Sequence, residues 1–145
     1  MLHIPNQLVH SGLTGDIIGA AMEVHSTLGP GFIESVYEES LAYEFELRKI
    51  PFERQKTFKV FYKARAVKTF VADFVADNTV IVEVKAIREI TEIEKLQVIN
   101  YLKASGLEVG LAINFGAPSL DYKRLIETNP RNPCNPRFTK KQQVE

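Results

Sequence analysis

The stretch that decides the fold is FVADFVADNTVIVEVK, residues 70–85. It contains two runs of β-forming residues, 70–75 and 80–85, separated by an Asp-Asn pair that is typical of a tight turn. Side chains alternate along a strand, so Glu83 and Lys85 share one face and Val84 lies on the other. Asp73 precedes Glu83 by ten residues, on the partner strand. We therefore expect a hairpin that carries two acids and one amine.

The length of the hairpin loop decides whether these charges share a face. A two-residue loop would put Asp73 and Glu83 on opposite faces, whereas a three-residue loop, 77–79, sets them directly across from each other. The apolar pattern favours the three-residue loop, because burial of each large side chain contributes about 1.5–3 kcal/mol. In that register six side chains gather on one face: Phe70, Ala72, Phe74, Val80, Val82 and Val84. We predict this register, with Asp73, Glu83 and Lys85 on the second face.

Two carboxylates and an ammonium group on a partly buried face have few stable arrangements. The acids repel each other and lose hydration, so they must pair with Lys85, hold a cation or face water. One interpretation is a magnesium-dependent phosphodiesterase site, in which the acids hold the ion and the lysine offsets nearby charge. The other is a structural ion pair, Glu83–Lys85 or Asp73–Lys85. The Glu-x-Lys pattern by itself leaves both open.

Periodicity predicts the other elements. Apolar residues recur at helical spacing from Leu13, with Thr14 as a candidate cap, until Gly29, and a second helix runs from about 33 to before Pro51. A period of two from Thr57 indicates a strand, with a polar turn at 64–68. A capping box of Thr91 and Glu94 opens a helix with Leu96, Ile99 and Leu102 in its apolar stripe, which ends at Gly106. A strand at 109–115, buried on both faces, and a short last helix at about 119–126 complete the chain.

The length of 145 residues, with 45% hydrophobic and 25% charged residues, is that of one globular α/β domain. We expect an N-terminal extension at 1–12, the domain at 13–127 and a flexible Pro/Asn-rich tail at 128–145. No apolar run reaches the roughly 20 residues of a membrane helix, and no secretory signal is present, so we expect a cytoplasmic protein without a membrane partner. The single cysteine, Cys134, excludes an internal disulfide and a cysteine-based zinc site. The three histidines, His3, His10 and His25, have no ligand spacing.

The net charge is zero, but the charges are segregated along the chain. Residues 34–46 contain five acids and no base, whereas residues 48–68 contain eight bases and one acid. The eight are Arg48, Lys49, Arg54, Lys56, Lys59, Lys63, Arg65 and Lys68. This basic strip would attract phosphates of a nucleic acid, or it would solvate an exposed strand edge and deter aggregation. The sequence leaves both interpretations open.

Two further pairs stand where a metal-dependent site would use them. Glu34 and Glu38 are four residues apart and therefore share a face of the second helix. Gln97 and Tyr101 have the same spacing on the third helix, where an amide and a phenol could hold a phosphate or a water. Each pair could also be ordinary solvated or boundary positions.

One stretch reads Gly31-Phe32-Ile33-Glu34-Ser35-Val36-Tyr37 and continues as Tyr37-Glu38-Glu39-Ser40-Leu41. This motif resembles that of a known family, the bacterial GxxExxY proteins. Further blocks in the same order are Glu53-Arg54-Gln55, Ala72-Asp73, 81–86, 97–102 and 113–116. The resemblance covers roughly residues 13–126, and it is specific because the blocks occur in order.

That family is placed among the PD-(D/E)XK nuclease-like proteins, so the resemblance implies a restriction-endonuclease-like core, α-β-β-β-α-β, with an extra N-terminal helix. It implies a nuclease that uses Mg²⁺ or Mn²⁺ and acts on DNA or RNA. The implied metal ligands are Asp73, Glu83 and the carbonyl of Val84, with Lys85 as the catalytic lysine. The implied supporting groups are Glu34 or Glu38 and Gln97, and the candidate substrate contacts are Tyr37, Tyr101, Arg54 and Lys56. Ala72 replaces the proline of the superfamily name, which affects only the strand before the acid.

Two rival hypotheses remain. The chain could be a non-catalytic nucleic-acid- or protein-binding module that keeps the fold while its acids form an ion pair. It could also be a structural homodimer built on the exposed strand 58–62, which would require no metal.

Overall fold

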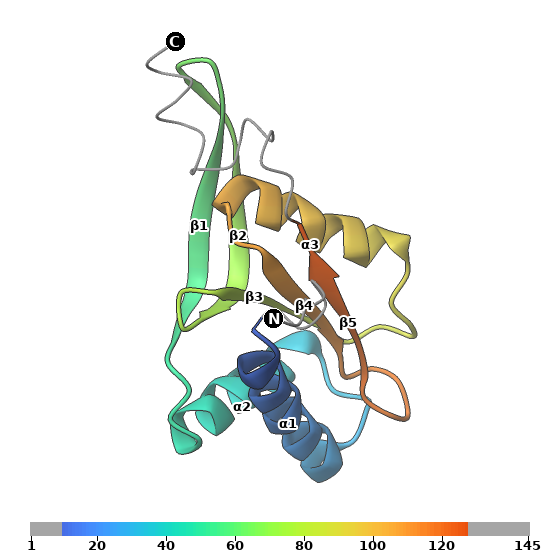
Figure 1. Ribbon diagram of the computed structural model, residues 1–145. Coiled ribbons are helices and arrows are strands. Elements are labelled where there is room, and N and C mark those ends of the chain that lie inside the picture. Colours follow the sequence, from blue (N-terminus) through green and yellow to red (C-terminus); the bar gives the residue numbers. More distant parts are fainter. Residues whose placement is uncertain (1–9, 128–145) are drawn as a thin grey trace, which may run out of the picture.

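The computed structural model describes residues 10–127, which form a five-stranded mixed sheet and three helices (Figure 1). Residues 1–9 of the predicted extension, with His3, and the predicted tail 128–145, with Cys134, lie outside the described residues. No helix within residues 10–127 has both the length and the apolar character needed to cross a membrane.

The chain alternates between helices and strands in the predicted α/β manner. The elements are α1 (Ser11–Leu28), α2 (Glu34–Leu47), β1 (Phe52–Tyr62), β2 (Arg65–Ala76), β3 (Val80–Lys85), α3 (Glu92–Ser105), β4 (Val109–Asn114) and β5 (Asp121–Ile126). The strand order is β1-β2-β3-β4-β5, and all neighbours are antiparallel except β3 and β4. Parallel strands need a crossover, and α3 supplies it. The predicted core order of helix, three strands, helix and strand is confirmed.

The predicted last helix at 119–126 is wrong, because this segment forms β5. It pairs with β4 from Asn114↔Asp121 to Val109↔Ile126. All six residues of β4 are buried. Without β5, this strand would have an unpaired edge inside the protein, and buried backbone groups without partners are costly. The pairing therefore outweighs the local helical pattern.

The predicted three-residue loop between β2 and β3 is confirmed. The pairs Phe74↔Val82, Val75↔Ile81 and Ala76↔Val80 leave residues 77–79 as the loop. Asp77 and Asn78 have φ angles of 49° and 55°, in the left-handed region that Asp and Asn tolerate better than most residues. The register that the apolar pattern favoured is the one formed.

The expectation that Phe70, Ala72 and Phe74 share a face is wrong. Phe74 packs with the residues that face α1 and α2, whereas Phe70 and Ala72 pack with those that face α3. Side-chain alternation breaks near Gln55 of the neighbouring strand, whose left-handed φ of 51° interrupts the regular β1–β2 ladder. The β2–β3 ladder ends at the same level, so β2 is free to turn there.

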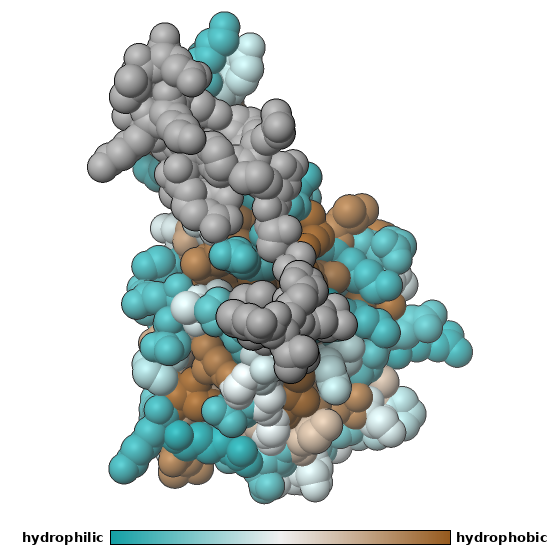
Figure 2. All heavy atoms as spheres, viewed as in Figure 1, coloured by the Kyte–Doolittle hydropathy of each residue, from teal (hydrophilic) through white to brown (hydrophobic). Residues whose placement is uncertain are grey.

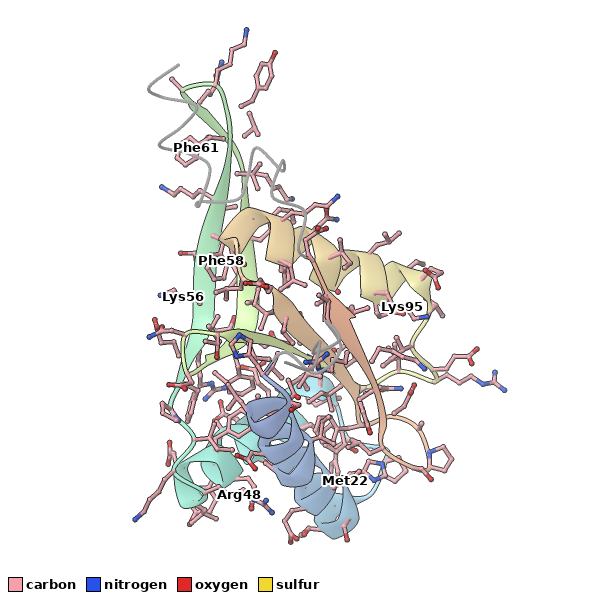
Figure 3. All side chains as sticks on the ribbon, viewed as in Figure 1. Met22, Arg48, Lys56, Phe58, Phe61 and Lys95 are labelled. Carbon is pink, nitrogen blue, oxygen red and sulfur yellow. The ribbon has the colours of Figure 1, made fainter. Side chains whose placement is uncertain are left out.

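The two faces of the sheet are covered by different helices. Val80, Val82 and Val84 pack with α1 and α2, and Ile81 packs with Val98 and Leu102 of α3. The outer residues of the β1–β2 hairpin, 57–71, pair only with each other among the described strands and extend away from the sheet (Figure 1). We call residues 57–71 the hairpin arm. On the hairpin arm, Phe61 lies closer to the tip than Phe58 (Figure 3).

Candidate active site

Asp73 and Glu83 lie where β2 separates from β3. The last paired residues before the separation are Phe74 and Val82. Beyond them, the N–H of Asp73 donates to Oε1 of Glu83 (2.9 Å), and the N–H of Val84 donates to Oδ2 of Asp73 (2.8 Å). Each carboxylate therefore replaces a backbone carbonyl of the interrupted ladder. The structure brings these two acids together from adjacent strands.

Glu83 is buried, Asp73 is partly buried, and both hold protons more tightly than usual. Glu83 is only 3% exposed. Burial, and then the charge of Asp73, raise the pKa of Glu83 to about 8. Burial also raises the pKa of Asp73 to about 6, with smaller contributions from the charges of Glu38 and Glu34. A bound cation would offset this mutual repulsion in place of the protons.

Lys85 extends from the end of β3 on the face that carries Glu83. Its charge lowers the pKa of both acids, against the effect of burial. Within residues 10–127, however, neither of the ion pairs considered from the sequence, Glu83–Lys85 or Asp73–Lys85, is formed. The carboxylates bond to backbone amides instead, so the ammonium group of Lys85 remains available to another anion.

At the end of β3, the hydrogen-bonding groups of successive residues point alternately to β4 and to β2. The C=O of Lys85 accepts from the N–H of Phe115, on the β4 side. The N–H of Val84 points the other way, to Asp73. In a strand, the N–H and the C=O of one residue point to the same neighbouring strand. The carbonyl of Val84 is therefore directed to the gap that holds the two acids.

The two predicted helix acids have different surroundings. Glu34 is exposed in the first turn of α2, and its charge raises the pKa of both Asp73 and Glu83. Glu38 accepts from Arg54 Nη2 (2.8 Å) and Gln55 Nε2 (2.9 Å). Glu34 is thus free to approach a ligand, and Glu38 is held by β1.

Two predicted substrate contacts, Arg54 and Lys56, are engaged in ion pairs. Arg54 binds Glu39 (2.8 Å) as well as Glu38, and these hydrogen bonds raise its pKa. Lys56 binds Glu53 (2.9 Å). A phosphate would have to displace these acids, so the placement of Arg54 and Lys56 offers it no free cation.

Tyr37 lies in the core, with no exposed surface. Its hydroxyl donates to the carbonyl of Gly29 (2.6 Å) and accepts from the N–H of Phe32 (3.1 Å), and its ring stacks on Phe115 at 4.8 Å. This placement argues against a contact with substrate. Through these two hydrogen bonds, Tyr37 fixes the loop between α1 and α2, which ends directly before Glu34.

Gln97 and Tyr101 line an open groove of about 730 Å³ between the hairpin arm and α3, together with Lys85. Gln97 Nε2 donates to the hydroxyl of Tyr101 (3.2 Å). Burial raises the pKa of this phenol, and the charge of Glu83 adds to the increase. Gln97 and Tyr101 therefore share a face of α3, as their spacing predicts, and this face lies close to Glu83.

Sequence reasoning missed part of this groove. Leu96 was expected in the apolar stripe of α3, but it is 58% exposed and lines the groove. The buried stripe consists of Val98, Tyr101 and Leu102, and Leu96 lies outside it. Val98 and Leu102, four residues apart, were the signal for the correct stripe. Lys68 lines the groove too and could be found only from the path of β2.

Asn114 was missed as a positioning residue behind the site. It is fully buried, and its Oδ1 accepts from the N–H groups of Ile87 and Gly116, both at 2.9 Å. These bonds fix the chain that leaves β3 two residues after Lys85. The available signal was an amide between two apolar strand residues, Ile113 and Phe115, because buried polar groups need partners.

The donors at the gap fit a magnesium ion. Residues 10–127 contain no group of three or more His, Cys, Asp or Glu side chains arranged to hold a metal. Mg²⁺ does not need one, because it keeps several waters and binds proteins through one or two carboxylates. Asp73, Glu83 and the carbonyl of Val84 are hard oxygen donors of this kind.

The sheet, its crossover helix and the two acids with a lysine at the end of β3 define the class of restriction-endonuclease-like α/β proteins. The family model of the PD-(D/E)XK nuclease superfamily matches residues 11–125, and the chain belongs to this superfamily. The match is consistent with the resemblance to GxxExxY proteins without testing it. Nucleases of this superfamily generally use divalent metals. No curated protein and no solved structure matched the chain.

Proposed function

We propose that this protein is a Mg²⁺- or Mn²⁺-dependent nuclease that hydrolyses phosphodiester bonds of nucleic acids. The observation that carries the proposal is the pair of desolvated carboxylates, Asp73 and Glu83, held across the gap between β2 and β3. Lys85, without an acidic partner in the described part of the chain, stands beside them.

Asp73, Glu83 and the carbonyl of Val84 would hold the cation. The backbone hydrogen bonds use one oxygen of each carboxylate, Oδ2 and Oε1, which leaves the second oxygen for this role. A divalent cation, when bound, lowers the pKa of a coordinated water and polarises the phosphate.

The other side chains act around this centre. The ammonium group of Lys85 would orient the attacking water or offset the charge that develops on the phosphate. Glu34 is better placed than Glu38 to bind a water, because Arg54 and Gln55 occupy Glu38. Gln97 would position a water or a phosphate oxygen through the amide that faces the groove.

The test is cleavage of labelled DNA and RNA, single- and double-stranded, with Mg²⁺ or Mn²⁺ and with a chelator. Lys85→Ala should lower the rate by about a hundredfold to a thousandfold, because charge stabilisation by a positioned cation is lost. Lys103→Ala is the matched control, since Lys103 is exposed on the last turn of α3 and does not line the groove. Cleavage that survives Lys85→Ala would contradict the proposal.

Metal binding can be tested without turnover. A ligand that binds only the native state raises its stability, so Mg²⁺ should raise the Tm of the wild type. The increase should disappear in Asp73→Asn and in Glu83→Gln. An equal increase in all three proteins would place the ion elsewhere.

One observation favours a second candidate, a non-catalytic binding module. The hydrogen bonds of Asp73 and Glu83 to backbone amides give both acids a structural role that requires no cation. Such a module would bind nucleic acid or protein without cleavage, and Mg²⁺ would leave its Tm unchanged. A homodimer through the edge strand β1 and a cytoplasmic location stay predictions.

A further inference from the structure

The groove beside Lys85 exists because the hairpin arm leaves the sheet. β2 pairs with β3 only at residues 74–76, whereas β3 continues to Lys85. Residues 68–71 of β2 therefore form one wall of the groove, and α3 forms the other. The acids lie at the point where the two strands separate, so the groove leads to them.

The walls of the groove are apolar and accessible. On α3, Leu96 and Ile93 are 58% and 75% exposed, and on the arm Phe70 is partly buried on the side that faces α3. Between these walls, Phe70 meets Tyr101 edge-on, with ring centroids 5.3 Å apart. Figure 2 shows hydrophobic residues at the surface over α3, among hydrophilic neighbours. Accessible apolar surface of this kind marks a binding site more often than a free surface.

The charge of the groove complements a polyanion. Lys85 lies at its inner part, and Lys68 lies farther out on the arm, where its Nζ is 5.9 Å from the centre of the Phe70 ring. Neither lysine has an acidic partner within residues 10–127. The one acid that lines the groove, Glu94, accepts from the N–H of Thr91 in the capping box of α3 (2.7 Å).

We propose that this groove binds a single, unpaired strand of nucleic acid. A nucleobase would lie against Leu96 and Phe70, and the flanking phosphates would contact Lys85 and Lys68. This inference rests on the proposed nuclease function and names its substrate class.

Two physical reasons favour a single strand over a duplex. The bases of a duplex are paired and stacked, so an apolar wall would meet only the sugar-phosphate backbone, whereas an unpaired base exposes a face that packs on apolar side chains. The volume of about 730 Å³ is also within the range of small-ligand sites, which suits one or two unpaired nucleotides.

The arm extends the same surface. Lys63 and Arg65 are exposed on it beyond Lys68, and Figure 3 places Phe61 near the same end. Cations interleaved with aromatic side chains are the composition of surfaces that bind single strands without sequence preference. A strand that leaves the groove outward would therefore meet further cations.

The test is binding of a labelled single-stranded oligonucleotide and of the corresponding blunt duplex, measured by fluorescence anisotropy in the presence of a chelator. Without metal, the measurement is independent of cleavage, so a failure of the nuclease proposal and a failure of this one can be told apart. We expect the single strand to bind at least about tenfold more tightly than the duplex.

Leu96→Glu removes an apolar wall and introduces a negative charge, so it should weaken single-strand binding at least about tenfold. Leu47→Glu is the matched control, because Leu47 is 59% exposed on α2, outside the groove, and should leave binding within about twofold. Both positions are exposed, and unchanged circular dichroism confirms that each variant folds. Lys68→Ala should reduce the slope of log K against log salt by about 0.7, as expected for one phosphate contact to a single strand.

Equal or tighter binding of the duplex would overturn the inference. Equal affinity of the Leu96→Glu and Leu47→Glu variants for the single strand would also overturn it. A protein that binds neither oligonucleotide would overturn it as well.

Discussion

The two faces of the sheet differ in how completely they are covered. Two helices, α1 and α2, cover one face and pack on the larger of the two hydrophobic clusters. One helix, α3, covers the other, with a smaller cluster that ends beside Glu83, Lys85 and the groove. A face that is fully packed has no space for a cation or a substrate. Stability therefore comes mainly from the first face, and the candidate chemistry lies on the second.

The largest difference between the faces should appear when one phenylalanine is removed from each. Phe74 is fully buried and meets Phe45 and Phe52 edge-on, with ring centroids at 5.3 and 5.7 Å, so Phe74→Ala should cost about 3–5 kcal/mol. Phe70 is only partly buried on the α3 face, and Phe70→Ala should cost about 1–2 kcal/mol. Urea unfolding measures both. Equal losses would mean that the faces contribute equally.

The second prediction concerns how closely α3 approaches the sheet. A Cβ added at Gly110 of β4 would lie 2.5 Å from Val98 Cγ1, so Gly110→Ala should destabilise the protein by about 1–3 kcal/mol. Gly15→Ala is the control, because this exposed position inside α1 has no atom within 4 Å of a new Cβ. It should stabilise α1 by about 0.5–1 kcal/mol. A neutral Gly110→Ala, by thermal or urea unfolding, would show that α3 can shift outward.

The third prediction is a loss of stability with rising pH in the absence of metal. The pKa of Glu83 is raised from 4.5 to about 8, so between these values the native state binds more protons than the unfolded state. Stability from this group is present at low pH and is lost as pH rises toward 8. One extra bound proton corresponds to about 1.4 kcal/mol per pH unit, or about 2 kcal/mol between about pH 6 and about pH 7.5.

Urea unfolding at several pH values with a chelator measures this slope. Glu83→Gln should flatten it, whereas Glu46→Gln, at an exposed position of α2, should leave it unchanged. Saturating Mg²⁺ should oppose the loss, because the cation favours the ionised acids. A slope that persists in Glu83→Gln would assign it to another group.

The smallest effect should come from the helix starts. Thr91 forms a complete capping box with Glu94 at the start of α3, so Thr91→Ala should cost about 1 kcal/mol. The N-cap of α2, Ile33, makes no side-chain cap and is exposed, so Ile33→Ala should change stability by less than about 0.5 kcal/mol. Thermal unfolding compares them. Similar losses would show that the cap does not hold α3 over the site.

Several features were readable from the sequence because each depends on nearby residues. The loop 77–79 followed from the alternation of valines with Glu83, the capping box from the spacing of Thr91 and Glu94, and the buried β4 from its continuous apolar run. The convergence of Asp73 and Glu83 followed from the loop length alone. Each of these depends on a period or a spacing that the chain carries locally.

Other features were misread because they depend on partners distant in sequence. Residues 119–126 form β5 because β4 needs a neighbour, which the segment itself does not reveal. Phe70 and Ala72 changed face because the ladder breaks beside Gln55, and Leu96 turned to the groove because α3 buries Val98 instead. Tyr37 carries a motif position, yet only its contacts with Gly29 and Phe115 show that it is part of the core.

The sequence alone determined the order of helices and strands up to β4 and which charged residues share a strand face, since periodicity and turn length operate over a few residues. The tertiary structure decided where β2 leaves β3, and with it the desolvation of Glu83, the availability of Lys85 and the groove beside them. Burial and raised pKa values result from the packing of distant segments. No local pattern encodes them.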